Sequence, residues 1–127
     1  MIASLLEERI LVLDGAMGTM IQSLNLEEKD FRGEKFSRNP VDLMGNNEVL
    51  NITNSQVIMD IHRMYLDAGS DIIETNTFSA NSISQSDYGL ENAAREMNVR
   101  AAEIARLAAD EAMHNDPSQT RFVAGAI

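Results

Sequence analysis

The sequence contains no cysteine among its 127 residues. This absence excludes disulfides, thiol catalysis and any cysteine-ligated metal site within the chain. The sequence also lacks a hydrophobic run close to the ~20 residues that a membrane-spanning helix needs. The first nine residues include Glu7 and Glu8 and lack the basic and apolar regions of a signal peptide. We therefore expect a cytoplasmic protein.

Positive charge is scarce as well. Ten basic residues face 20 acidic ones, which gives a formal net charge of −10. Such a balance argues against nucleic acids and anionic membrane surfaces as partners. Hydrophobic residues make up 44% of the chain and charged residues 24%, which is typical of a soluble globular protein. The length predicts one domain over residues 1–127 with a core of its own.

The stretch from residue 10 to residue 20 has the form of a site. Four apolar residues, 10–13, lead into Asp14, and the small residues 15–18 follow before a helical segment. Proteins of the α/β class bind ligands where a strand ends in such a turn. In the alternative interpretation, Asp14 only caps the next helix. The glycines match neither the P-loop nor the GxGxxG pattern, so a phosphate site is disfavoured.

Residues 71–75 repeat this form, because an apolar run again ends in a carboxylate, here Glu74. A helix predicted over residues 55–67 separates the two strands, which indicates a right-handed βαβ crossover with parallel pairing. Parallel strands end at the same edge of a sheet, so we expect Asp14 and Glu74 to lie together. His62 falls one position from the apolar face of this helix, where a partly buried position is expected. It has no accompanying ligand cluster and receives no role.

The remaining pattern predicts helices over residues 2–8, 19–24 and 91–112, a short helix within 76–90, and a third strand over 121–127. Residues 25–47 are expected to form a long loop with one helical turn around 27–31. The order βαβαβ fits an open doubly wound sheet or the first part of a (β/α)8 barrel of roughly 250 residues. We expect a parallel βαβαβ fragment of such a barrel, truncated after the third strand. Its exposed strand edge would favour self-association.

Six sequence runs resemble the homocysteine-binding module of the cobalamin-dependent methionine synthases. They are residues 13–19 (Leu-Asp-Gly-Ala-Met-Gly-Thr), 45–50, 61–62 together with 65–69, 71–78 (Asp-Ile-Ile-Glu-Thr-Asn-Thr-Phe), 87–90 and 122–126. The resemblance implies a (β/α)8 barrel that transfers a methyl group to homocysteine and forms methionine. It further implies a zinc ion held by three cysteines, and methylcobalamin recharged from methyltetrahydrofolate on separate modules. Relatives that use betaine or S-methylmethionine share the fold.

The resemblance implies that this chain supplies the amino-acid end of the homocysteine site, through Asp14, Gly15, Ala16, Met17, Glu74 and Asn76. Asp14 would hold the ammonium group, and the backbone of residues 15–17 would face the carboxylate. Asn76 is a weaker candidate than the others, as are Thr77 and Phe78. Because the family's zinc ligands are cysteines, neither metal ligands nor catalytic residues are assigned here, and the chain alone should be inactive. The alternatives are a truncated, non-catalytic small-molecule-binding or oligomeric domain, and an unrelated anion-binding βαβ domain.

Overall fold

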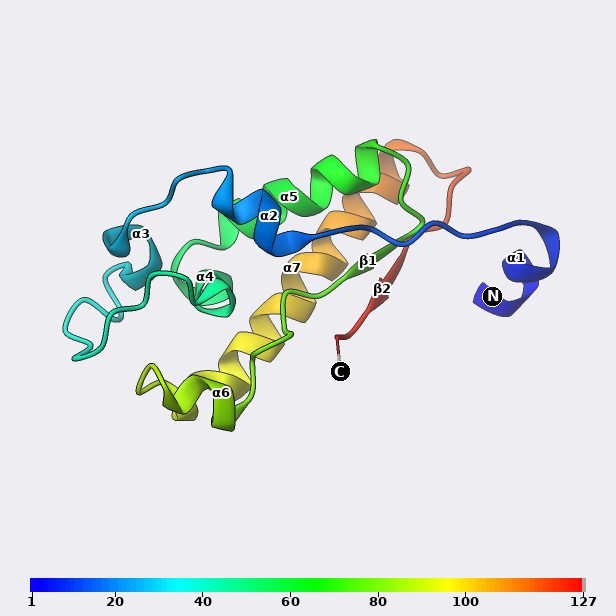
Figure 1. Cartoon of the computed structure of the whole chain (residues 1–127). Helices are drawn as coiled ribbons and strands as arrows, with labels where there is room; N and C mark the ends of the chain where they lie inside the picture. The colour runs from blue at the N-terminus through cyan, green and yellow to red at the C-terminus, as the bar shows by residue number, and fades with distance from the viewer. Residues whose placement is uncertain (127) are drawn as a thin grey trace.

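Two long helices and a two-stranded parallel sheet form the centre of the computed structural model, which describes residues 1–126 (Figure 1). The strands β1 (Ile72–Glu74) and β2 (Phe122–Ala124) pair in parallel, with Ile73 opposite Val123. Helix α5 (Ser55–Asp67) precedes β1, and helix α7 (Ala94–Asn115) connects the strands. The predicted α/β class and parallel pairing are confirmed. Both strands are shorter than predicted, and residue 127 lies outside the described residues.

The segment over residues 10–13 runs beside β1 without forming a regular strand (Figure 1). Leu13 makes a single parallel bridge to Ile72, and the Asp14 N–H donates to the Ile72 carbonyl oxygen at 2.9 Å. The predicted parallel pairing with β1 is therefore correct. An apolar run without alternation, as in residues 10–13, is typical of a strand covered on both faces, but here the Ile10 side chain is 87% exposed. Within the described chain this segment pairs along one side only, and the side chains of Ile10, Val12 and Leu13 stay at least half exposed.

A buried carboxylate aligns this segment with the sheet. Asp71 accepts hydrogen bonds from Nη1 and Nη2 of Arg9 at 2.9 and 2.7 Å, and from the Val12 N–H at 2.8 Å. Arg121 on the other side brings Nη1 to 3.9 Å from the same carboxylate. The Arg9 hydrogen bonds are the main reason that the pKa of Asp71 falls to about 2. The ionised carboxylate thus connects three segments at the amino ends of the strands.

The hydrophobic core lies where α5 and α7 pack on each other and on the sheet. Buried alanines on α7 allow close helix packing. Helix α5 has the predicted bounds, and Gly69 ends it with a φ of +108°, which glycine adopts readily. His62 is fully buried in this helix, contrary to the partly buried position expected from its spacing. It lies beside the apolar face, which is wide enough here to enclose it.

The remaining elements are short. Helix α1 (Ile2–Glu8) has its predicted bounds, and helix α2 (Met17–Gln22) begins two residues before its prediction. The region of residues 25–47 contains α3 (Glu28–Arg32), close to the predicted turn. The other short elements are η1 (Asn47–Val49) and α4 (Leu50–Thr53) before α5, and α6 (Ser82–Ser86) and η2 (Glu91–Ala93) between β1 and α7. Helix α7 starts after η2 and so begins and ends later than predicted. No helix among residues 1–126 is long and apolar enough to cross a membrane.

Candidate functional site

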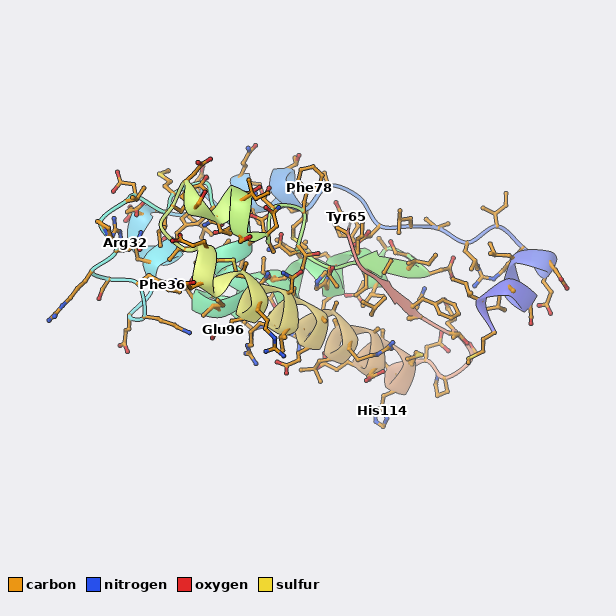
Figure 2. The ribbon with its side chains drawn as sticks, turned by 90° about the horizontal axis from the view of Figure 1, so that it is seen from below. Arg32, Phe36, Tyr65, Phe78, Glu96 and His114 are labelled. Atoms are coloured by element: carbon orange, nitrogen blue, oxygen red, sulfur yellow. The ribbon has the colours of Figure 1, made fainter. Side chains whose placement is uncertain are left out.

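A hollow of about 480 Å³ opens where the first extended segment and β1 end. Four stretches form its wall, namely residues 14–18, residues 47–48, residues 74–78 and Ala126. These are the carboxyl ends of parallel segments, where α/β proteins place their ligands. The wall includes all six residues predicted to bind substrate, which are Asp14, Gly15, Ala16, Met17, Glu74 and Asn76. It also includes Thr77 and the exposed Phe78, which projects from the ribbon in Figure 2.

Asp14 has one engaged and one free carboxylate oxygen. Its Oδ2 accepts a hydrogen bond from the Glu74 N–H at 3.0 Å. Its Oδ1 is buried and has no hydrogen-bond partner among the described residues. Burial raises the pKa of Asp14, and the nearby Glu74 carboxylate raises it further, against the opposing effect of the backbone hydrogen bond. Asp14 does not cap α2, whose N-cap is Ala16 without a side-chain hydrogen bond.

Three carboxylates line the hollow, from Asp14, Glu48 and Glu74, and its described wall contains no lysine, arginine or histidine. Glu48 is buried and its Oε1 accepts the Ser79 N–H at 3.1 Å. This arrangement favours a cationic group such as an ammonium. Glu48 was not predicted, because it lies in the 3₁₀ turn η1, which has no hydrophobic period. The clues in the sequence were the carboxylate that follows the turn signal at residues 45–47 and the family resemblance of residues 45–50.

The Asn76 side chain supports the wall from within. Its Nδ2 donates to the Asn47 carbonyl oxygen at 2.9 Å and to Asn51 Oδ1 at 3.1 Å. Asn51 in turn donates from Nδ2 to the Asn76 carbonyl oxygen at 2.8 Å. Both side chains are buried, and the amide protons of Asn76 are engaged within the protein. The two asparagines therefore join η1 and α4 to the loop after β1.

The sequence model of the homocysteine S-methyltransferase family matches residues 11–127. The chain belongs to the homocysteine S-methyltransferase family. Its fold is similar to crystal structures of the homocysteine methyltransferase MmuM from Escherichia coli in metallated, oxidised and apo forms. The TM-scores are 0.73, 0.73 and 0.65, at 23%, 23% and 22% sequence identity.

The chain spans less than half of those MmuM structures. The matches include 96%, 96% and 97% of this chain, but only 39%, 39% and 38% of the MmuM chains. Identity at this level shows a shared fold. The metal of the metallated form belongs to the E. coli protein.

The donor set of this family member does not fit the zinc site that the resemblance implies. The sequence has no cysteine, and residues 1–126 hold no group of three or more histidine, aspartate or glutamate side chains that could hold a metal ion. The carboxylates at the hollow come from separate stretches and two of them already accept backbone hydrogen bonds. The described residues therefore do not provide the ligands that such a zinc site needs.

Proposed function

We propose that this chain binds the amino-acid end of homocysteine in a methyltransferase that forms methionine. Asp14 Oδ1 accepts the ammonium group, and the backbone N–H groups of residues 15–17 face the substrate carboxylate. Glu74 and Glu48 add negative potential on the same side, which favours the cationic ammonium. The buried Oδ1 without a partner is the observation that carries this proposal. Membership of the homocysteine S-methyltransferase family supports the choice of substrate.

The proposal includes a longer protein in which these residues form the first part of a (β/α)8 barrel, up to its third strand. The small share of the MmuM structures that the chain covers supports this view. Zinc would be bound by cysteines outside residues 1–127, so this chain alone would be inactive. The intact protein would be cytoplasmic. The proposed methyl donor is methylcobalamin, which would be recharged on folate and cobalamin modules. We choose this donor because the residues of the motifs most resemble those of the cobalamin-dependent methionine synthases. Methyl transfer from S-methylmethionine or betaine by the intact protein, and none from methylcobalamin, would reassign the donor.

The substrate assignment can be tested by calorimetric titration of L-homocysteine and of 4-mercaptobutanoate, which lacks only the amino group. We expect wild-type protein to prefer L-homocysteine, and Asp14→Asn to lose most of this preference. A charge-assisted hydrogen bond corresponds to about ten- to hundredfold in affinity. Asp67→Asn serves as the matched control, because Asp67 is exposed and lies at the far end of α5. An unchanged preference in Asp14→Asn would refute the assigned role of Asp14.

We also propose that the exposed apolar strip formed by Ile10, Val12 and Leu13 is covered in the functional protein, by the rest of the barrel or by a second copy of this chain. All three side chains are at least half exposed beside β1. Unpaired, apolar edge segments promote association. Sedimentation of the 127-residue chain should reveal a concentration-dependent dimer, and Leu13→Lys should abolish it. A monomer at all concentrations would contradict pairing between copies.

A further inference from the structure

The turn at residues 15–16 is held at both of its ends. Before the turn, the Asp14 N–H donates to the Ile72 carbonyl oxygen at 2.9 Å. After it, the hydroxyl of Tyr65 on α5 donates to the Ala16 carbonyl oxygen at 3.1 Å. Tyr65 is half-buried and packs against the core. Helix α5 thus reaches the turn through this one side chain.

Gly15 allows the Tyr65 ring to approach the turn. A Cβ atom added at Gly15 would lie 3.2 Å from Tyr65 Oη and 3.3 Å from Cε1, closer than most real contacts of such an atom. The φ angle of Gly15 is not in the left-handed region. Glycine is therefore needed here for space and not for backbone conformation. Its lack of a side chain brings the ring and the turn into direct contact.

Few other hydrogen bonds hold this turn within residues 1–126, although Met17, just after it, packs against the core. Helix α2, which starts immediately after it, has no side-chain cap. Within residues 1–126, the Tyr65 hydroxyl is the only side-chain group that hydrogen-bonds to residues 15–17. Tyr65 itself is not part of the wall of the hollow. Any influence of Tyr65 on a ligand must therefore pass through the turn.

We propose that Tyr65 is a positioning residue of the homocysteine site. Its hydroxyl and ring fix the turn at residues 15–16, so that the backbone N–H groups of residues 15–17 stay directed at the substrate carboxylate. This inference rests on the proposed function of the hollow. One neutral hydrogen bond corresponds to about two- to tenfold in an equilibrium constant, which sets the size of the expected effect.

Tyr65→Phe removes the hydroxyl and keeps the ring. In the intact methyltransferase we expect the KM for L-homocysteine to rise about two- to tenfold with kcat unchanged. Amide hydrogen exchange of Asp14, whose N–H donates to the Ile72 carbonyl oxygen just before the turn, should accelerate by a similar factor, while exchange in the buried part of α7 stays the same. A merely structural role would lower thermal stability and speed exchange throughout the core instead. Equal KM and equal exchange in wild type and Tyr65→Phe would overturn the inference.

Tyr88→Phe is the matched control. Tyr88 is also half-buried against the core, and its hydroxyl makes no hydrogen bond within the described part of the chain. We expect its KM and its amide exchange at Asp14 to equal those of wild type, and a KM rise as large as that of Tyr65→Phe would overturn a specific role for Tyr65. Failure of wild-type protein to bind L-homocysteine would instead refute the proposed function. Binding that is unaffected by Tyr65→Phe would refute the role of Tyr65 alone.

The contact with Gly15 offers a second test. Gly15→Ala should raise the KM in the wild-type background, because its Cβ atom would push the turn away from the ring. The rise should be smaller in the Tyr65→Phe background, where the nearest atom, Oη, is gone. Independent effects of the two substitutions on the KM would contradict a shared action on the turn.

Discussion

Asp14 and Glu74 are 60 residues apart in sequence and meet through one hydrogen bond, from the Glu74 N–H to Asp14 Oδ2 at 3.0 Å. The bond joins the ends of two parallel segments at the point where the hollow opens. Burial is the main reason that the pKa of Asp14 is raised, and the nearby Glu74 carboxylate raises it further, while the hydrogen bond itself acts in the opposite direction. A bound ammonium group would relieve the repulsion between the two carboxylates. The same geometry therefore opposes folding slightly and favours a cationic ligand.

Asp14→Asn should separate stability from binding. The raised pKa means that ionised Asp14 is less favoured in the folded than in the unfolded chain, so its charge opposes folding above the unfolded pKa. At pH 7 the free energy of unfolding should stay the same or rise by less than about 1 kcal/mol, since the group is partly solvated. Urea denaturation measures this directly. A destabilisation above about 2 kcal/mol would indicate that Asp14 serves mainly to hold the fold together.

His62 should make the protein sensitive to mild acid. Burial lowers its pKa from 6.5 to about 4, and neither ring nitrogen has a partner among the described residues. Below pH 6.5 the unfolded chain therefore binds a proton that the folded chain excludes, and stability falls as the pH drops toward 4. Between pH 7 and pH 5, wild type should lose about 2 kcal/mol more than His62→Leu.

Urea titrations at the two pH values provide this comparison. His62→Leu should also be at least as stable as wild type at pH 7, because it removes a buried polar ring that lacks hydrogen bonds. His114→Leu is the control, since that residue is exposed near the end of α7 and its side chain projects away from the ribbon in Figure 2. Parallel pH profiles for wild type and His62→Leu would rule out His62 as the acid-sensitive group.

Arg9→Gln should shift the acid limit of stability. Arg9 is the main reason that the pKa of Asp71 lies near 2 instead of 3.8. A lowered folded pKa stabilises the fold above about pH 4, and this contribution disappears as the pH falls from 4 toward 2. In Arg9→Gln, NMR titration should find the pKa of Asp71 closer to 3.8 and acid unfolding should begin at higher pH. Arg106→Gln, in an exposed helical pair with Asp110, should leave both unchanged.

Asn51→Ala should destabilise the wall of the hollow. The substitution leaves the Asn76 carbonyl oxygen without its Asn51 donor and removes an acceptor of the Asn76 side-chain amide. Buried polar groups left without partners cost about 1–3 kcal/mol, so we expect a loss of about 2 kcal/mol in the free energy of unfolding. Gln56→Ala, which removes an exposed hydrogen bond to Asp60, should change it by less than about 0.5 kcal/mol. Equal effects of the two substitutions would argue against the asparagine pair.

Local signals in the sequence account for much of the fold. The bounds of helix α5 could be predicted from local signals. Apolar residues with a period of 3.6 predict the helix itself, and the glycine at position 69 predicts where it ends. The meeting of Asp14 and Glu74 could be expected because parallel strands align their carboxyl ends. The start of helix α2 lies two residues before its prediction, since no side-chain cap marks it.

Long-range contacts decided the rest. The exposure of residues 10–13 and the burial of His62 depend on which segments cover them, and an apolar run looks the same in either case. Glu48 reaches the hollow because two amide pairs join distant segments, Asn46 with Gln85 and Asn51 with Asn76.

The sequence by itself determined the family, the helices and the strand-end carboxylates, because these follow from local periodicity and contiguous motifs. Only the tertiary structure decided that Glu48 completes the hollow, that Asn76 braces it from within, and that Tyr65 holds the turn beside Asp14. A hydrogen bond between residues 49 positions apart leaves no periodic trace in the sequence. It forms only when packing of α5 against the sheet brings the two groups within reach.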